Sequence, residues 1–125
     1  MYHLLLVCVG GALGAGMRHL STSAVARLVG IAFPWGTLAV NLVGCLAMGL
    51  LVGILARKLG VPHEIRLFLA TGVLGGFTTF SAFSLDVAVL WERGAQIAAL
   101  SYVLASVAGS ILALFGGLWL ARSML

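Results

Sequence analysis

Neutral polar side chains recur at helical spacing, so that together they could bind an ion. Asn41 is the only asparagine of the chain, and Thr37 precedes it by four residues. Tyr102, Ser106 and Ser110 follow one another at four-residue intervals, which places their hydroxyls along one face of a helix. In a membrane, such residues also act as interhelical hydrogen-bond partners or as packing residues. Both interpretations, structural and functional, stay open for these residues taken alone.

Two phenylalanines and the small number of acids narrow the kinds of ion that the protein could carry. Phe80 and Phe83 lie three residues apart, and the positive edge of a phenyl ring favours an anion without carrying a charge. Ordinary packing is the alternative for both rings. The only acids, Glu64, Asp86 and Glu92, lie near the ends of apolar stretches, which disfavours a proton-coupled carrier or a cation filter. The remaining neutral donors suit a small anion that accepts strong hydrogen bonds.

Catalytic and metal-binding arrangements are not recognisable. No predicted geometry joins a nucleophile, a base and an orienting acid, so the chain is not expected to be an enzyme. His3, His19 and His63 are scattered and do not form a set of ligands. Cys8 and Cys45 lie in apolar segments and are expected to pack as small hydrophobic residues.

The segment Gly72–Ser84, GVLGGFTTFSAFS, combines helix-weakening glycines, paired threonines and two phenylalanines within an apolar stretch. We expect the helix to break here. Backbone that leaves a helix at membrane depth has polar groups that lipid cannot satisfy, so these groups must face protein, water or an ion. Such breaks are typical of transport sites.

The composition places these residues in a bilayer. The 125 residues are 62% hydrophobic and 8% charged, with a mean hydropathy of +1.21, which leaves too little polar surface for a soluble globule. A membrane-spanning helix needs roughly 20 apolar residues. The sequence predicts an all-α membrane protein with a single transmembrane domain, 1–125, and both termini on one side. Its four predicted spans cover about 4–26, 35–56, 65–90 and 95–120.

Basic residues are divided almost evenly between the predicted loops. Their spread along the chain predicts no nucleic-acid partner, but Lys and Arg near span ends set the orientation of a membrane protein. One side would hold Arg57, Lys58, Arg66 and Arg122, and the other Arg18, Arg27 and Arg93. This near tie favours insertion in both orientations, so that two copies pair head to tail. A single topology with a weak bias is the alternative.

Glycines predict a tightly packed bundle. Gly49 and Gly53 have the small-xxx-small spacing that lets helix backbones approach closely. Because four helices enclose little interior, we expect a pore to form where two subunits meet. A monomeric membrane anchor is the alternative.

Over nearly its full length, the chain resembles the Fluc (CrcB) family of bacterial fluoride channels. The segments that carry the resemblance are Gly10–Arg18 (GGALGAGMR), Trp35–Gly44 (WGTLAVNLVG), Gly72–Ser84, and Tyr102 with Ser106 and Ser110. The resemblance implies an antiparallel, dual-topology homodimer with a broken third helix in the bacterial inner membrane. Two pores would pass fluoride passively out of the cell and exclude chloride. The expected partners are fluoride, a second copy of the chain and the lipid bilayer.

The resemblance also implies roles for individual residues. Asn41 would donate its amide to fluoride, and Phe80 and Phe83 would turn ring edges to the ion. The polar track along each pore would comprise Thr37, Tyr102, Ser106 and Ser110. A structural sodium ion at the dimer interface would be held by the backbone carbonyls of Gly75 and Thr78. Whether Arg18 steers anions at a vestibule stays open.

Two other classes compete with this interpretation. A small multidrug-resistance exporter also has about four short spans and forms an antiparallel dimer, but it depends on a glutamate in the first span. The first predicted span here, about Leu4 to Ala26, contains no acid. A non-transporting assembly subunit would explain the glycines but not the row of hydroxyls or the expected break.

Overall fold

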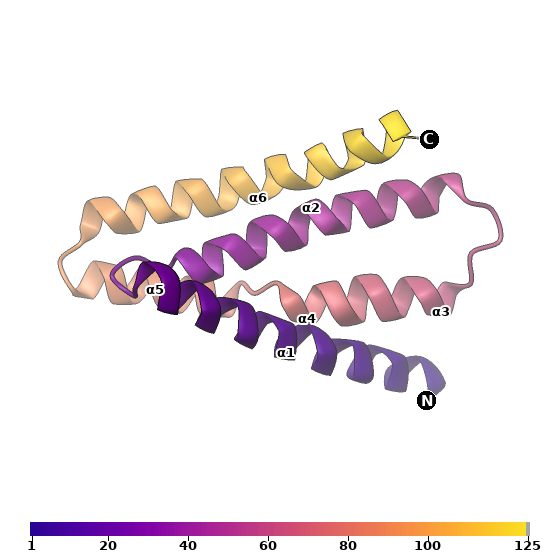
Figure 1. Ribbon diagram of the computed structural model, residues 1–125, viewed down its shortest axis with the longest axis horizontal. Helices are drawn as coiled ribbons and strands as arrows, with labels where there is room; N and C mark the ends of the chain where they lie inside the picture. The colour runs from indigo at the N-terminus through magenta and orange to yellow at the C-terminus, as the bar shows by residue number, and fades with distance from the viewer. Residues whose placement is uncertain (125) are drawn as a thin grey trace.

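The computed structural model describes residues 1–124, and the regular structure of that part of the chain is entirely helical. Helical passes run back and forth along the bundle, and the two termini lie at the same end (Figure 1). In chain order the elements are α1 (Tyr2–Val29), α2 (Trp35–Arg57), α3 (His63–Arg66), η1 (Leu67–Leu74), α4 (Gly75–Phe77), α5 (Ser81–Glu92) and α6 (Gln96–Met124).

Within residues 1–124, four helical passes are long and apolar enough to cross a bilayer, as many as the spans predicted from the sequence. The first, second and fourth passes are the single helices α1, α2 and α6. The third pass, His63–Glu92, is assembled from α3, η1, α4 and α5. The helices extend past several predicted limits, with α1 ending at Val29 and α6 at Met124. Basic residues in their last turns, Arg27 and Arg122, can stay helical where water and headgroups solvate them.

Short loops join the passes at one end of the bundle. Gly30, with φ 85°, follows the end of α1, and Gly94, with φ 87°, turns the chain between α5 and α6. Both positions require the left-handed backbone that glycine adopts without strain. Arg93 Nη2 donates to the carbonyl oxygen of Ala32 at 2.6 Å, so the two loops at this end are tied together.

Close backbone contacts organise the bundle into two helix pairs. The longest contact joins α2 to α6, and α1 packs along η1 and α4 (Figure 1). A Cβ atom added to Gly14 would overlap the carbonyl oxygen of Val73, and one added to Gly117 would overlap the carbonyl oxygen of Leu46. Glycine therefore sets the separation of the helices in both pairs.

The third pass changes helix type along its length. Residues Leu67–Leu74 form a π-helix, in which backbone bonds join residues five apart, a rare geometry that is frequent at functional sites. The short helix α4 ends at Phe77, and Thr78 is extended, with φ −83° and ψ 158°. Residues Thr78–Phe80 are outside any helix, and α5 begins at Ser81. We call Thr78–Phe80 the non-helical segment.

A small apolar cluster fixes α5 against α6 and the start of α2. Its buried members are Leu38, Phe83, Leu90, Ala99 and Tyr102. Elsewhere, large apolar side chains cover the outside of the bundle. Such an outer surface is expected for helices that face lipid or a second subunit.

The close contact between α2 and α6 predicts that adding one methyl group at Gly117 lowers the stability of the protein. Gly117→Ala should lower the free energy of unfolding by about 1–3 kcal/mol, because the new Cβ overlaps backbone atoms of α2. Reversible unfolding in mixed detergent micelles measures this change. The matched control is Gly116→Ala, whose Cβ meets nothing within 4 Å and should stabilise the helix slightly. Equal stability of the two variants would contradict the packing described.

Candidate ion pathway

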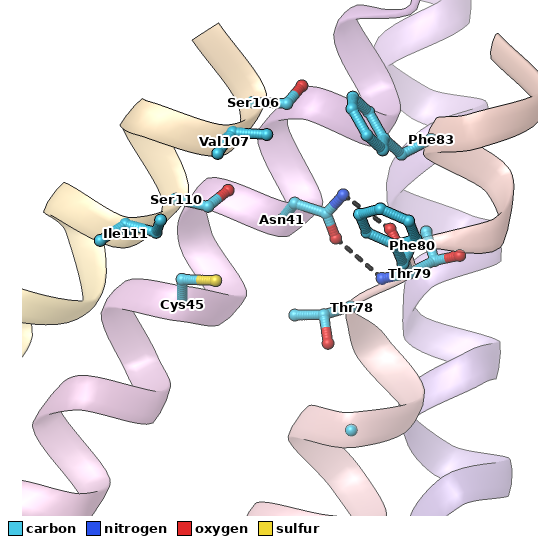
Figure 2. A pocket seen from close by; sticks show the side chains of 11 residues that line it. Asn41, Cys45, Thr78, Thr79, Phe80, Phe83, Ser106, Val107, Ser110 and Ile111 are labelled. Carbon is cyan, nitrogen blue, oxygen red and sulfur yellow. Dashed lines mark hydrogen bonds between the residues drawn. The ribbon is translucent and has the colours of Figure 1, made fainter. Parts of the chain in front are cut away.

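A side chain from α2 holds the non-helical segment of the third pass. Asn41 Oδ1 accepts the backbone N–H of Thr79 at 2.8 Å, and Asn41 Nδ2 donates to the carbonyl oxygen of Thr79 at 2.9 Å (Figure 2). The carboxamide thus pairs both backbone groups of one residue, as a neighbouring β-strand would. Because lipid offers no hydrogen-bond partner, this pairing makes a non-helical residue tolerable at membrane depth.

The pairing also changes which backbone groups remain free. In a continuous α-helix, the N–H groups of Thr79 and Ala82 would bond to the carbonyl oxygens of Gly75 and Thr78. Here the Thr79 N–H bonds to Asn41, and the Ala82 N–H bonds to Thr79 Oγ1 at 3.1 Å. The carbonyls of Gly75 and Thr78, predicted to bind a metal ion, have therefore lost their helical donors.

A cavity of about 460 Å³ lies between α2, the α4–α5 region and α6. It brings together most of the predicted pathway residues and both predicted metal-binding residues. Its lining comprises Asn41, Cys45, Gly75, Thr78, Thr79, Phe80, Phe83, Ser106, Val107, Ser110 and Ile111. Figure 2 shows the amide of Asn41 at the centre of this set, with side chains of three passes around it. None of the lining side chains carries a formal charge.

The two phenylalanines of the cavity differ in how they are held. Their ring centroids are 5.3 Å apart and the rings are tilted by 56°. Phe83 is 7% exposed and packs on the Tyr102 ring, at a centroid distance of 5.2 Å. Phe80 is 75% exposed in a single copy of the chain. One ring is thus fixed by the core, and the other stands at the edge of the cavity.

The predicted row of hydroxyls divides into two environments. Ser106 and Ser110 line the cavity. Ser106 is buried, and its Oγ lies near the Tyr102 hydroxyl, as does the Thr37 hydroxyl, but within residues 1–124 it makes no well-formed hydrogen bond. Tyr102 does not line the cavity: it is fully buried, and its hydroxyl donates to Asp86 Oδ2 at 3.0 Å.

Two predicted residues, Thr37 and Arg18, lie in a second cavity of about 290 Å³. Its lining comprises Ala15, Arg18, His19, Thr22, Thr37, Thr79 and Ala82. Thr79 is the one residue that the two linings share. The pairing between Asn41 and Thr79 therefore lies where the two cavities meet.

Several residues of the site were not predicted. Cys45 lies four residues after Asn41, a spacing that puts both on one helix face, so periodicity could have identified it. The role of Thr79 depends on its backbone, which carries no side-chain signature. The bond between Asp86 and Tyr102 joins two different helices, and local spacing does not reveal it.

The pairing of Asn41 with Thr79 predicts a local loss of protection. Asn41→Leu keeps roughly the same volume but leaves the N–H and C=O of Thr79 unpaired, which should cost about 1–3 kcal/mol. Unfolding in detergent measures the stability, and amide hydrogen exchange at Thr79 should accelerate. The control Cys45→Ala, one turn further along α2, should leave that exchange unchanged. Unaltered exchange in Asn41→Leu would mean that the pairing does not hold the segment.

Comparisons with known proteins agree with this architecture. Residues 5–118 match the family model described as "CrcB-like protein, Camphor Resistance (CrcB)". A protein of Chelativorans sp. strain BNC1 is 78% identical over the whole of both chains. Proteins of Mesorhizobium japonicum and Agrobacterium fabrum are 64% and 54% identical, each over 99% of both chains. All three relatives are named "Fluoride-specific ion channel FluC". With a match that covers nearly the whole sequence, this chain belongs to the CrcB-like family.

Proposed function

We propose that this chain is a fluoride-specific ion channel that lets fluoride leave the bacterial cytoplasm passively across the inner membrane. The observation that carries the proposal is the 460 Å³ cavity, in which an amide, hydroxyls and phenyl rings gather without any charged side chain. The printed names of the relatives support the same assignment. An ion channel is a transport protein, so no catalytic residues are assigned.

Neutral donors on the cavity wall suit fluoride, which must exchange its water for equally good partners. Asn41 uses one amide N–H on Thr79, and an amide nitrogen carries a second hydrogen. The Ser106 hydroxyl makes no well-formed hydrogen bond among residues 1–124. The edges of Phe80 and Phe83 add partial positive charge. Chloride accepts weaker hydrogen bonds than fluoride and gains less from the same donors.

The lack of charge in the cavity favours conduction over retention. An ion passes through a pore quickly only if it is bound firmly enough to enter and weakly enough to leave. A lysine or arginine beside Asn41 would hold an anion tightly. The cavity offers dipoles instead, so fluoride would move along it in short steps.

The exporter interpretation lacks the residue that it needs. A small multidrug-resistance exporter depends on a glutamate in its first span, and the sequence of α1, Tyr2–Val29, contains no acid. The cavity between α2, the third pass and α6 also has no function in a purely structural assembly subunit. Neither alternative is supported by a specific feature of the chain.

We further propose that two copies form an antiparallel, dual-topology homodimer whose third passes are broken at the non-helical segment. The near balance of basic residues supports insertion in both orientations. The 75% exposure of Phe80 supports a partner that covers it. In such a dimer, two pores would form, each completed by both subunits.

A structural sodium ion at the dimer interface is part of this proposal. The carbonyls of Gly75 and Thr78 fit the role, because Asn41 and Thr79 have taken the N–H groups that a helix would supply to them. Unwound carbonyls are the oxygen ligands that bind sodium in broken transporter helices. When bound, the ion would supply a positive charge beside these carbonyl oxygens, in place of the N–H donors that they have lost.

The function predicts fluoride efflux from reconstituted liposomes. A fluoride electrode should record efflux once an ionophore releases the counter-cation, whereas a chloride electrode should record none. Phe83→Ile keeps an apolar side chain but removes the ring edge, so efflux should fall about tenfold, equivalent to ~1.4 kcal/mol. The matched control is Phe115→Ile, at an exposed position of α6 outside the cavity. Liposomes that release no fluoride would refute the channel.

The dimer proposal predicts that orientation controls activity. Several lysines added between Arg57 and Pro62 should force one orientation, since lysines beside a span stay on the cytoplasmic side. This variant alone should show no efflux. Co-expression with a variant that carries the same lysines between Gly30 and Pro34 should restore efflux. If the first variant is active without its counterpart, the antiparallel arrangement is wrong.

A further inference from the structure

Two histidines and a glutamate gather where the first and third passes begin. His3 lies in the first turn of α1, and His63 and Glu64 open α3. Both starts lie at the same end of the bundle (Figure 1). The centroids of the His3 and His63 rings are 5.5 Å apart and the rings meet edge to face, at 84°. His3 Nε2 lies 3.4 Å from Glu64 Oε1. Sequence spacing left these histidines scattered, whereas the fold makes two of them neighbours.

The separations within this cluster are close to those of ligands on one metal ion. Zinc binds imidazole nitrogen at about 2.0–2.1 Å and carboxylate oxygen at about 2.0–2.2 Å, so two ligand atoms on one tetrahedral ion are about 3.3 Å apart. The ring centres of two imidazoles on the same ion are then about 5 Å apart. The observed distances of 3.4 Å and 5.5 Å are near both values. A hydrogen bond between nitrogen and oxygen is ordinarily shorter, about 2.7–3.2 Å, so direct contact uses these groups poorly.

The cluster is accessible from water. The side chains of His3 and Glu64 are 55% and 41% exposed, and His63 is exposed as well. The 28 residues of α1 rise about 42 Å, which exceeds the roughly 30 Å of the hydrocarbon core. The first turn of α1 therefore reaches the surface of the membrane, where a dissolved metal ion can meet it.

We propose that His3, His63 and Glu64 bind one transition-metal dication such as Zn²⁺. Two imidazoles and a carboxylate, with water in the fourth position, are a ligand set that zinc uses. Within residues 1–124, no three His, Cys, Asp or Glu side chains are already arranged to hold a metal, so the side chains must turn to close the site. Exposed side chains change rotamer within nanoseconds, and no movement of the backbone is required.

The bound ion ties the first pass to the third, away from the proposed fluoride pathway. Among residues 1–124, the linings of the two larger cavities include none of the three ligands. The helix α3 leads directly into η1, so the ion holds the start of the pass that carries the non-helical segment. The inference does not depend on the fluoride channel, and the failure of either would leave the other standing.

The first test is isothermal titration of the untagged protein in detergent with Zn²⁺. One ion should bind per chain, and Mg²⁺, which prefers oxygen ligands, should not replace it. His3→Gln and His63→Gln should each weaken the binding of Zn²⁺ at least about tenfold, since even the loss of a group that only supports a ligand costs that much. The matched controls His19→Gln and Cys45→Ser should bind Zn²⁺ as the unmodified protein does. No binding, or unchanged affinity in either of the first two variants, would overturn the inference.

The second test asks whether the ion joins the two passes. Amide hydrogen exchange should slow on addition of Zn²⁺ both in the first turn of α1 and in α3, because an ion that bridges them restrains both. In His3→Gln, the protection of α3 should be lost together with that of α1, although position 3 lies in a different helix. Protection confined to one of the two helices, or protection of α3 that survives in His3→Gln, would show that the metal does not bridge the passes and would overturn the proposed site.

Discussion

The pairing of one carboxamide with the backbone of one residue is the constraint on which the site depends. Asn41 gives Thr79 a donor and an acceptor at 2.9 and 2.8 Å, so the third pass can leave the helix where lipid supplies neither. Without a partner from α2, these backbone groups would be satisfied most cheaply by a continuous helix. Such a helix would again engage the carbonyls of Gly75 and Thr78 and turn Phe80 to a different direction.

The same pairing connects the two helix pairs and lies beside both cavities. It joins the α2–α6 pair to the α1–η1 pair, and glycine contacts hold each of these pairs at close range. It also lies between two cavities of different character. One is neutral and holds Phe80 and Ser106, and the other contains Arg18 and His19. The residue that the carboxamide holds thus borders both a wall of dipoles and a wall that carries a fixed charge.

The sequence predicted the large features better than the contacts. Four spans followed from hydropathy, because the bilayer sets their length. Five residues singled out from the sequence, Asn41, Phe80, Phe83, Ser106 and Ser110, line one cavity, and their spacing along apolar segments was the signal. What could not be predicted was pairing between segments. Nothing in local spacing indicates that Asn41 bonds to the backbone of Thr79, that Asp86 engages Tyr102, or that Thr37 belongs to a separate cavity. Such contacts depend on how whole helices dock.

The π-helix η1 has a consequence for the length of the chain. Its eight residues, Leu67–Leu74, advance with wider turns than an α-helix of the same size. A π-helical turn holds one residue more than an α-helical turn, so a single deletion there would be absorbed by relaxation to ordinary α-helix, and the residues after it would stay in register. A single deletion early in α2 has no such reserve and would rotate Asn41 by about 100° about the helix axis, away from Thr79. The stretch Leu67–Leu74 should therefore tolerate a shortening that the regular helix carrying Asn41 does not.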